Sequence, residues 1–206
     1  MKNNTIITIS REYGSGGRII GQKVSEKLGI PFYDNELINL AAERSGINEE
    51  YFKEVDTMPK SSIILTLSVL SPSTEVYGMP LNEKIFLAQS KVIREIAEEG
   101  PCVIVGRCAD YVLENNPNVV NVFIHSPMPN RVKRVKEVYG DKVHDNIESY
   151  IKKIDRRRAS YYSFFTDKSW GKANNYSLVL NSDQIGIDNC VDIIIDYINK
   201  KEEHNK

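Results

Sequence analysis

The sequence predicts an α/β fold, a three-layer sandwich around a central parallel sheet of about five strands. Short apolar runs rich in β-branched residues recur along the chain, and segments with helical spacing alternate with them. Buried strands that alternate with amphipathic helices pair in parallel and are covered on both faces. The chain has 206 residues, of which 41% are hydrophobic, so we expect one core and a single domain over 1–206.

Two strand–helix pairs open the chain. Residues 5–10 (TIITIS) form a β-branched run, and residues 19–28 show the apolar spacing of a helix that stops at Gly29. Residues 31–34 (PFYD) give a second short strand, and a helical stretch over 35–45 follows. This alternation predicts that both strands belong to the parallel sheet.

An inserted segment is expected next. Residues 47–80 show little periodicity, contain three prolines, and hold an apolar patch, SIILTLSVL, that is compatible with helix or strand. We expect the whole insert to extend over about 35–85. Residues 83–99 then carry an apolar stripe typical of a helix, which Gly100 and the following proline terminate.

Three further strands complete the predicted sheet. They lie at 102–105 (CVIV), 119–125 (VVNVFIH) and 176–182 (YSLVLNS). A last helix is expected over 187–199, and the polar residues 200–206 are expected to fray.

Composition excludes several classes of function. Lys and Arg number 27 against 28 Asp and Glu, so no overall field attracts nucleic acid or a membrane, and neither is an expected partner. Cys102, Cys108 and Cys190 are widely spaced and form no CxxC pair, which argues against a disulfide framework and a zinc site. The sequence shows neither a basic and apolar leader nor an apolar run of roughly 18 residues. We therefore expect a cytoplasmic protein.

A glycine-rich turn follows the first strand, at residues 11–18 (REYGSGGR). Gly14, Gly16 and Gly17 allow the backbone to approach an anion closely, and the helix that follows directs free N–H groups and its positive dipole end into the turn. Ligands of parallel sheets collect at the carboxyl ends of the strands, where this turn lies. A tight turn without a ligand is the alternative, but the position after the first strand favours phosphate binding.

The loop departs from the standard pattern GxxxxGK[ST], in which the lysine reaches the transferred phosphates and the hydroxyl holds magnesium. If Gly16 is the last loop glycine, the lysine position is Gly17 and the hydroxyl position is Arg18. We expect Arg18 to supply the missing charge, because a guanidinium binds phosphate oxygens in a fork. Arg11 is its competitor.

The magnesium ligands are left open by the sequence. Ser15 in the loop and Asp34 after the second strand are both candidates. Water and nucleotide phosphates could instead provide most of the coordination.

Cations gather again later in the chain. Arg107 directly follows the strand at 102–105, and two basic clusters lie at 129–136 and 152–158. A surface ion pair and solvated helix faces are the alternative explanations. Phosphoryl transfer needs cations to offset developing negative charge. We slightly favour this functional interpretation of the basic residues over the two structural ones.

In order along the chain, these features resemble cytidylate kinase, and the resemblance covers nearly the whole sequence. The shared features are the glycine-rich loop, FYD after the second strand, VIVGR after the third, an Arg-rich helix, the motif DRRR at 155–158, and the strand LVLNS. The string REYGSGGR is typical of the branch called cytidylate kinase-like. The resemblance implies a P-loop nucleoside triphosphate hydrolase-like fold.

The resemblance also implies roles for single residues. The loop residues would hold the donor phosphates of ATP: Gly14, Ser15, Gly16, Gly17 and Arg18. Arg131 and Arg134 would approach ATP. Arg107, Asp155 and Arg158 would contact the acceptor or the transferring phosphoryl and, with Arg18, act in catalysis. Asp34 would open the acceptor-binding helix.

The acceptor itself stays open. The Tyr-Arg pair of cytidylate kinases is replaced here by Asn39-Leu40, and their Gly-Arg-Asp reads Gly106-Arg107-Cys108, with an acid only at Asp110. The implied reaction is transfer of the ATP γ-phosphoryl, with Mg²⁺, to a nucleoside monophosphate, most of all CMP or dCMP. An insert at 35–85 would bind the acceptor and an Arg-rich lid at 127–170 would close over it. A nucleotide-binding regulatory protein and a kinase of another small metabolite are the rivals.

Three other features are assigned to structure rather than to chemistry. His125 is expected to be a histidine with satisfied hydrogen bonds at a strand end, and Cys108 beside Arg107 is expected to be a packing residue. The aromatic run at 161–165 and Trp170 are expected to pack the lid onto the core.

Overall fold

A computed structural model of the chain describes residues 5–34, 36–46, 80–139 and 146–204. Its centre is a five-stranded sheet in the order β2-β3-β1-β4-β5, and every neighbouring pair is parallel. The strands are β1 (Ile6–Arg11), β2 (Phe32–Tyr33), β3 (Cys102–Val105), β4 (Val119–His125) and β5 (Leu178–Asn181). The predicted α/β class and the central parallel sheet are confirmed.

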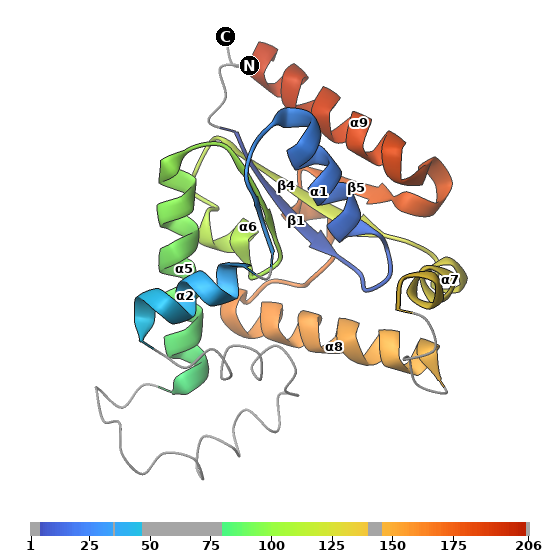
Figure 1. Ribbon diagram of the computed structural model, residues 1–206, viewed down its shortest axis with the longest axis horizontal. Helices are drawn as coiled ribbons and strands as arrows, with labels where there is room; N and C mark the ends of the chain where they lie inside the picture. Colours follow the sequence, from blue (N-terminus) through green and yellow to red (C-terminus); the bar gives the residue numbers. More distant parts are fainter. Residues whose placement is uncertain (1–4, 35, 47–79, 140–145, 205–206) are drawn as a thin grey trace.

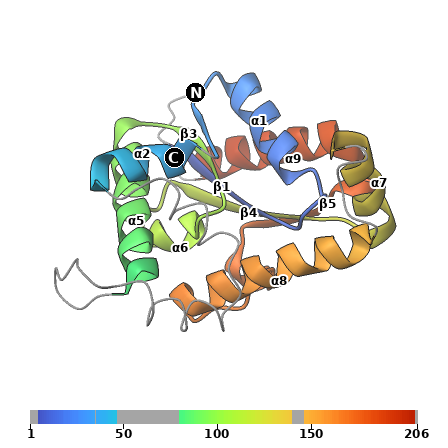
Figure 2. The same cartoon turned by 60° about the horizontal axis from the view of Figure 1, so that its bottom comes forward.

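Helices cover both faces of this sheet (Figure 1). The longer ones are α1 (Gly17–Leu28), α2 (Glu36–Ser45), α5 (Leu81–Glu99), α7 (Met128–Tyr139), α8 (Ile147–Thr166) and α9 (Ser182–His204). Two short ones are α6 (Ala109–Val112) and a 3₁₀ turn, η2 (Ala173–Asn175). Figure 2 shows α8 running from α7 towards α5. No helix in the described ranges is long and apolar enough to span a bilayer.

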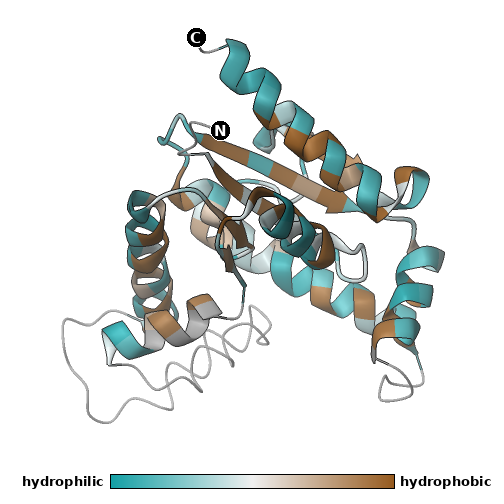
Figure 3. Ribbon diagram, turned by 45° about the horizontal axis from the view of Figure 1, so that its top comes forward, coloured by the Kyte–Doolittle hydropathy of each residue, from teal (hydrophilic) through white to brown (hydrophobic). Residues whose placement is uncertain are grey.

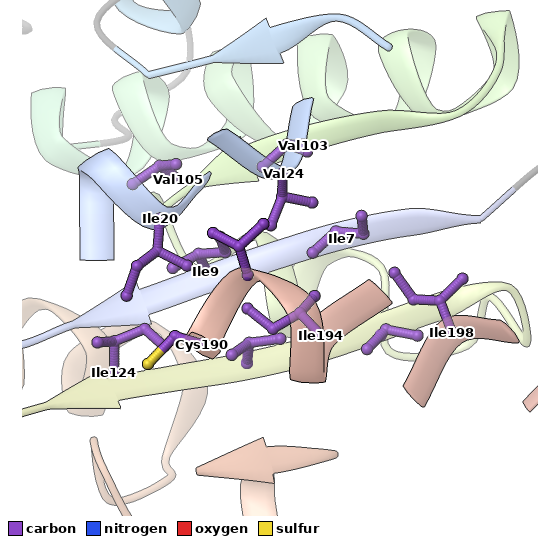
Figure 4. Packing of buried hydrophobic residues seen from close by; sticks show 13 residues of the cluster. Ile7, Ile9, Ile20, Val24, Val103, Val105, Ile124, Cys190, Ile194 and Ile198 are labelled. Carbon is purple, nitrogen blue, oxygen red and sulfur yellow. The ribbon is translucent and has the colours of Figure 1, made fainter. Parts of the chain in front are cut away.

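Strand alternation divides the core into two layers. Ile7 and Ile9 of β1 are fully buried on the face that α1 and α9 cover, together with Ile194 of α9 (Figure 4). Ile6 and Ile104 face the other layer, under α2, α5 and α6. In Figure 3 the central strands are largely brown, whereas the helices carry teal outer faces. The sheet is therefore buried on both sides, as parallel sheets require.

Some strand and helix boundaries differ from those predicted from the sequence. β5 is shorter than the predicted strand at 176–182, and α9 contains a non-helical Gly186 just before the predicted helix start. The expected fraying of residues 200–206 is wrong for those that are described, because the helix continues to His204. Lys201 holds this end in place, since its Nζ donates to the carbonyls of Pro117 and Val119, each at 2.9 Å. The apolar patch SIILTLSVL, which the sequence left open between helix and strand, lies outside the described residues, as does most of the predicted insert.

Candidate functional site

The phosphate-loop candidate connects β1 to α1 at the carboxyl edge of the sheet. Gly14 and Gly16 have φ of 79° and 84°, a left-handed conformation that favours glycine. Gly16 is the N-cap of α1, and within the described structure this helix start has no side-chain cap and no acidic residue in its first turn. The first N–H groups of a helix lack intrahelical partners and carry its positive dipole end. This helix start can therefore receive an anion.

Two serines fix the loop from inside. Ser15 is fully buried, and its hydroxyl donates to the Glu12 carbonyl at 2.8 Å. Ser182, the first residue of α9, donates to the Ser15 carbonyl at 2.5 Å and is 1% exposed. Ser182 ends the predicted strand LVLNS, but its contact with the loop is not visible in the sequence, because only the fold brings residues 15 and 182 together.

Three arginines from α7 and α8 bind carbonyl oxygens of the loop. The bonds run from Arg131 Nε to Tyr13 O at 2.8 Å, from Arg134 Nη1 to Gly14 O at 2.7 Å, and from Arg158 Nη1 to Arg11 O at 2.9 Å. The Arg158 guanidinium also lies 5.5 Å from the Tyr13 ring centroid. The predicted basic clusters thus converge on the loop, and they hold its backbone in one shape.

Arg131 is the buried centre of a cluster of charged side chains. It is 4% exposed, its Nη2 pairs with Asp155 Oδ2, and its Nη1 lies 3.1 Å from Glu12 Oε2. Asp155 Oδ1 also accepts the Tyr13 N–H at 2.8 Å, and Glu12 Oε2 accepts the Ser126 N–H at 3.1 Å. Each charge in the cluster has an opposite charge and at least one hydrogen bond, which is the condition for burying ions at acceptable cost.

Asp34 marks the opposite side of the loop, at the end of β2. Asp34 is 8% exposed and forms ion pairs with two arginines. Arg18 Nε lies 2.5 Å from its Oδ2, and Arg11 Nη2 lies 3.6 Å from its Oδ1. The Arg18 side chain is 55% exposed and its Cζ lies 6.0 Å from the Phe32 ring centroid. The structure therefore brings together the predicted residues Asp34, Arg18 and Arg11.

Arg107 follows β3 in an unusual backbone conformation. Gly106, Arg107 and Cys108 all have left-handed φ, of 81°, 59° and 54°. Non-glycine residues pay a conformational cost there, and such strain concentrates at functional sites. The end of β3 lies beside the end of β1, so Arg107 belongs to the same edge as the loop.

One family model matches residues 6–184, and its description is the cytidylate kinase-like family. The chain belongs to the cytidylate kinase-like family. Membership indicates a kinase-type phosphotransferase with a P-loop nucleotide-binding fold. No curated protein matches the sequence.

Solved structures agree with this fold. The crystal structure of an uncharacterized protein from Eubacterium ventriosum is 29% identical, with a TM-score of 0.69 over 95% of this chain and 98% of the other. Shikimate kinase from Bacteroides thetaiotaomicron is 16% identical, with a TM-score of 0.56 over 95% and 98%. A gluconokinase from Sinorhizobium meliloti is also 16% identical, with a TM-score of 0.56 over 99% and 97%. The last two show the P-loop kinase fold alone.

A buried hydroxyl and carboxyl pair lies behind the site of this cytidylate kinase-like protein. The Tyr162 hydroxyl of α8 donates to Asp110 Oδ2 of α6 at 2.7 Å, and both residues are buried. Burial is the largest cause that raises the pKa of Asp110, and burial also raises the pKa of Tyr176 to about 12. The pair joins α8 to the strand end that carries Arg107.

The Asp110 carboxyl gives a pH-dependent prediction. The pKa of Asp110 in the folded state lies above its ordinary value of 3.8. Between pH 3.8 and that higher pKa, the folded state therefore binds more protons than the unfolded state does. Stability should fall as pH rises through that window and stay lower above it. Asp110→Asn should remove this decline, as thermal unfolding midpoints across acidic pH would measure. Asp192→Asn, at an exposed position, is the charge-matched control, and equal pH profiles for wild type and Asp110→Asn would contradict the prediction.

Sequence reasoning missed Gln89 on α5. Gln89 is 1% exposed, and its Oε1 accepts the Tyr161 hydroxyl of α8 at 3.2 Å. A signal was present, because Gln89 is a polar residue spaced by four and three positions from Ile85 and Val92 of the apolar stripe. It links α5 to the helix that carries the DRRR motif.

The aromatic residues after that motif pack as expected. Phe165 stacks on Phe86 of α5 with centroids 4.2 Å apart, and Trp170 meets Phe123 of β4 edge-on at 5.2 Å. All three cysteines are free and buried, which agrees with packing roles. The mobility of the predicted lid stays a prediction.

The magnesium candidates differ in their surroundings. Ser15 is fully buried and its hydroxyl is directed to a loop carbonyl, whereas Asp34 is 8% exposed and has two arginines on its carboxylate. In the described portion of the chain, no three His, Cys, Asp or Glu side chains form a metal cage. These residues fit a Mg²⁺ bound chiefly through nucleotide phosphates and water, as is usual for this ion.

Proposed function

We propose that this protein transfers the γ-phosphoryl of ATP to a nucleoside monophosphate, with CMP or dCMP as the foremost acceptor. The observation that carries the proposal is that arginines of α7 and α8 contact the loop before the uncapped start of α1. The ends of β1 and β3, which carry Arg11 and Arg107, meet at the same edge of the sheet. A phosphoryl group in transfer develops negative charge, and preorganised cations around it lower the barrier. Family membership supports the same chemistry.

The donor half of the site is the loop and the helix that follows it. In this proposal the N–H groups of Gly14 to Arg18 bind the donor phosphates, and Mg²⁺ accompanies them. Arg134 binds the Gly14 carbonyl while its side chain is half-buried, so it can reach both the loop and an ATP oxygen. Arg131 is buried behind Tyr13, and we assign it to holding the loop for ATP.

The acceptor half lies between Asp34 and α8. We assign Asp34 and Arg107 to contacts with the acceptor, and Arg158 to the transferring phosphoryl. Asp155 orients this end of α8 against the loop through Arg131 and the Tyr13 N–H. Residues 127–170 act as the lid and residues 35–85 as the acceptor-binding insert of a single domain, and closure excludes water from the reaction.

The proposed compartment is the cytoplasm. Three free, buried thiols support a reducing environment, and a near-neutral charge balance supports small nucleotides rather than nucleic acid or membrane as partners.

An acceptor panel tests the proposal. ADP release from ATP and Mg²⁺ should be measured with CMP, dCMP, UMP, AMP and GMP offered separately, and ATP binding should be measured by calorimetry. We expect turnover with a cytidine nucleotide. ATP binding without turnover on any nucleotide would reject the proposal, and the same assay with small hydroxylated metabolites would then separate a metabolite kinase from a regulatory nucleotide-binding protein.

A further inference from the structure

Two positions of the phosphate loop have exchanged residue types relative to the standard pattern. In GxxxxGK[ST] the first glycine lies five positions before the last one, and the lysine directly follows the last. With Gly16 as the last glycine, Arg11 occupies the place of the first, and Gly17 occupies the place of the lysine. This chain therefore has a cationic side chain where the pattern has none, and no side chain where the pattern has its cation.

The two positions face each other in space. A β-carbon added at Gly17 would lie 2.5 Å from Arg11 Cβ and 3.1 Å from Arg11 Cγ. It would also lie 3.2 Å from Ile124 Cβ on β4, so the backbone has little room to shift. Carbon atoms in proteins pack at about 3.5 to 4.0 Å. Only one of the two positions can carry a side chain in this loop.

The Arg11 side chain passes a second glycine on its way to Asp34. A β-carbon on Gly106 would collide with Arg11 Nη1 and lie 3.4 Å from Arg11 Cζ. Beyond Gly106, Arg11 Nη2 lies 3.6 Å from Asp34 Oδ1, and the Arg11 side chain is 19% exposed. The Arg11 side chain therefore extends from the start of the loop, past the end of β3, to Asp34, which the proposed function assigns to the acceptor.

Arg18 has a different placement. Its side chain is 55% exposed, and its guanidinium contacts Asp34 and the face of Phe32. Arg18 pairs with Oδ2 of Asp34 whereas Arg11 pairs with Oδ1, and the Arg18 side chain is the more exposed of the two. Its geometry suits support of Asp34 better than contact with a phosphate inside the loop.

We propose that Arg11 supplies the cation that a lysine supplies in standard phosphate loops, and that Gly17 lacks a side chain because Arg11 fills its space. This inference rests on the proposed function, since it assigns Arg11 to the phosphoryl that passes between donor and acceptor. The planar guanidinium binds two phosphate oxygens at once, so the exchange keeps the charge and changes the geometry of contact.

Reciprocal variants test the exchange. Arg11→Met removes the charge but keeps most of the packing, Arg11→Gly empties the space, Gly17→Lys adds the lysine beside Arg11, and Arg11→Gly with Gly17→Lys restores the standard pattern. Arg18→Ala is the competitor control. Binding of ATP and of inorganic tripolyphosphate would be measured by calorimetry, because neither needs an acceptor, and thermal unfolding would be recorded for every variant.

The exchange predicts a specific order of effects. Arg11→Met and Arg11→Gly should weaken tripolyphosphate binding about 10- to 100-fold, the range of a lost charged hydrogen bond. Gly17→Lys alone should lower the unfolding temperature, because its β-carbon meets Arg11. The double variant should recover both the unfolding temperature and most of the binding. Arg18→Ala should weaken tripolyphosphate binding less than Arg11→Met does.

Two results would overturn the inference. One is a double variant that folds like wild type and yet binds tripolyphosphate no better than Arg11→Gly. The other is wild-type binding by Arg11→Met together with lost binding by Arg18→Ala, which would make Arg18 the cation. If binding follows the exchange while wild type phosphorylates none of the five nucleotides, the inference stands and the proposed acceptor class fails.

Discussion

Asp155→Ala is expected to destabilise the protein by about 3 to 5 kcal/mol, because it leaves the buried Arg131 guanidinium without its main counter-ion. Arg131 is 4% exposed, and the remaining carboxylate, Glu12, contacts only Nη1. The substitution also removes the acceptor of the Tyr13 N–H, so the loop should loosen at its tip. Denaturant unfolding monitored by circular dichroism measures the loss.

A surface ion pair on the same helix provides the control for Asp155→Ala. Glu148 pairs with Lys152 across one helical turn, and both side chains are more than half exposed. Glu148→Ala should cost less than about 1 kcal/mol, as exposed pairs usually do. If Asp155→Ala costs no more than Glu148→Ala, the cluster around Arg131 does not hold the loop.

Arg158→Ala is expected to lower kcat about 10²- to 10³-fold, the usual cost of removing one group that stabilises transition-state charge. Arg158 Nη1 binds the Arg11 carbonyl at 2.9 Å, and its guanidinium lies over the Tyr13 ring. In the proposed function this guanidinium also contacts the transferring phosphoryl. Steady-state kinetics with the preferred acceptor measure the effect on kcat and KM separately.

Arg156→Ala is the matched control for this prediction. Arg156 belongs to the same DRRR motif and is exposed on the outer face of α8. Its removal changes the net charge equally and should leave kcat within a factor of about two, as substitutions away from a site do. Similar losses in both variants would mean that the charge of α8 as a whole, rather than Arg158 in particular, promotes transfer.

The fold could be predicted from the sequence because its buried strands are short, continuously apolar runs. The run CVIV is buried on both faces in β3, and the alternation of such runs with amphipathic helices specified a parallel sheet. The four-residue helix α6 was not predicted, because it starts after Cys108 in a left-handed conformation and is too short to show periodicity. The boundary at the end of α9 failed because contacts of Lys201 with distant carbonyls override its polar composition.

The site was readable only in part. The loop and the basic clusters follow from local patterns, whereas the grip of Arg131, Arg134 and Arg158 on the loop joins residues 118 to 147 positions apart. Such contacts depend on how α7 and α8 dock, which a single sequence does not specify. The sequence alone indicates Arg11 only as a competitor of Arg18, because the proximity of Arg11 to Gly17 and Gly106 exists only in three dimensions.

Direct detection of the phosphorylated product tests the central claim most simply. Wild-type protein would be incubated with ATP, Mg²⁺ and CMP or dCMP, and the products followed by ³¹P nuclear magnetic resonance, with Arg158→Ala in parallel. The account predicts that CDP or dCDP signals grow as ATP signals decline, and that the variant forms them far more slowly. Undiminished CMP and dCMP in the presence of protein that binds ATP, or equal product from wild type and variant, would contradict it.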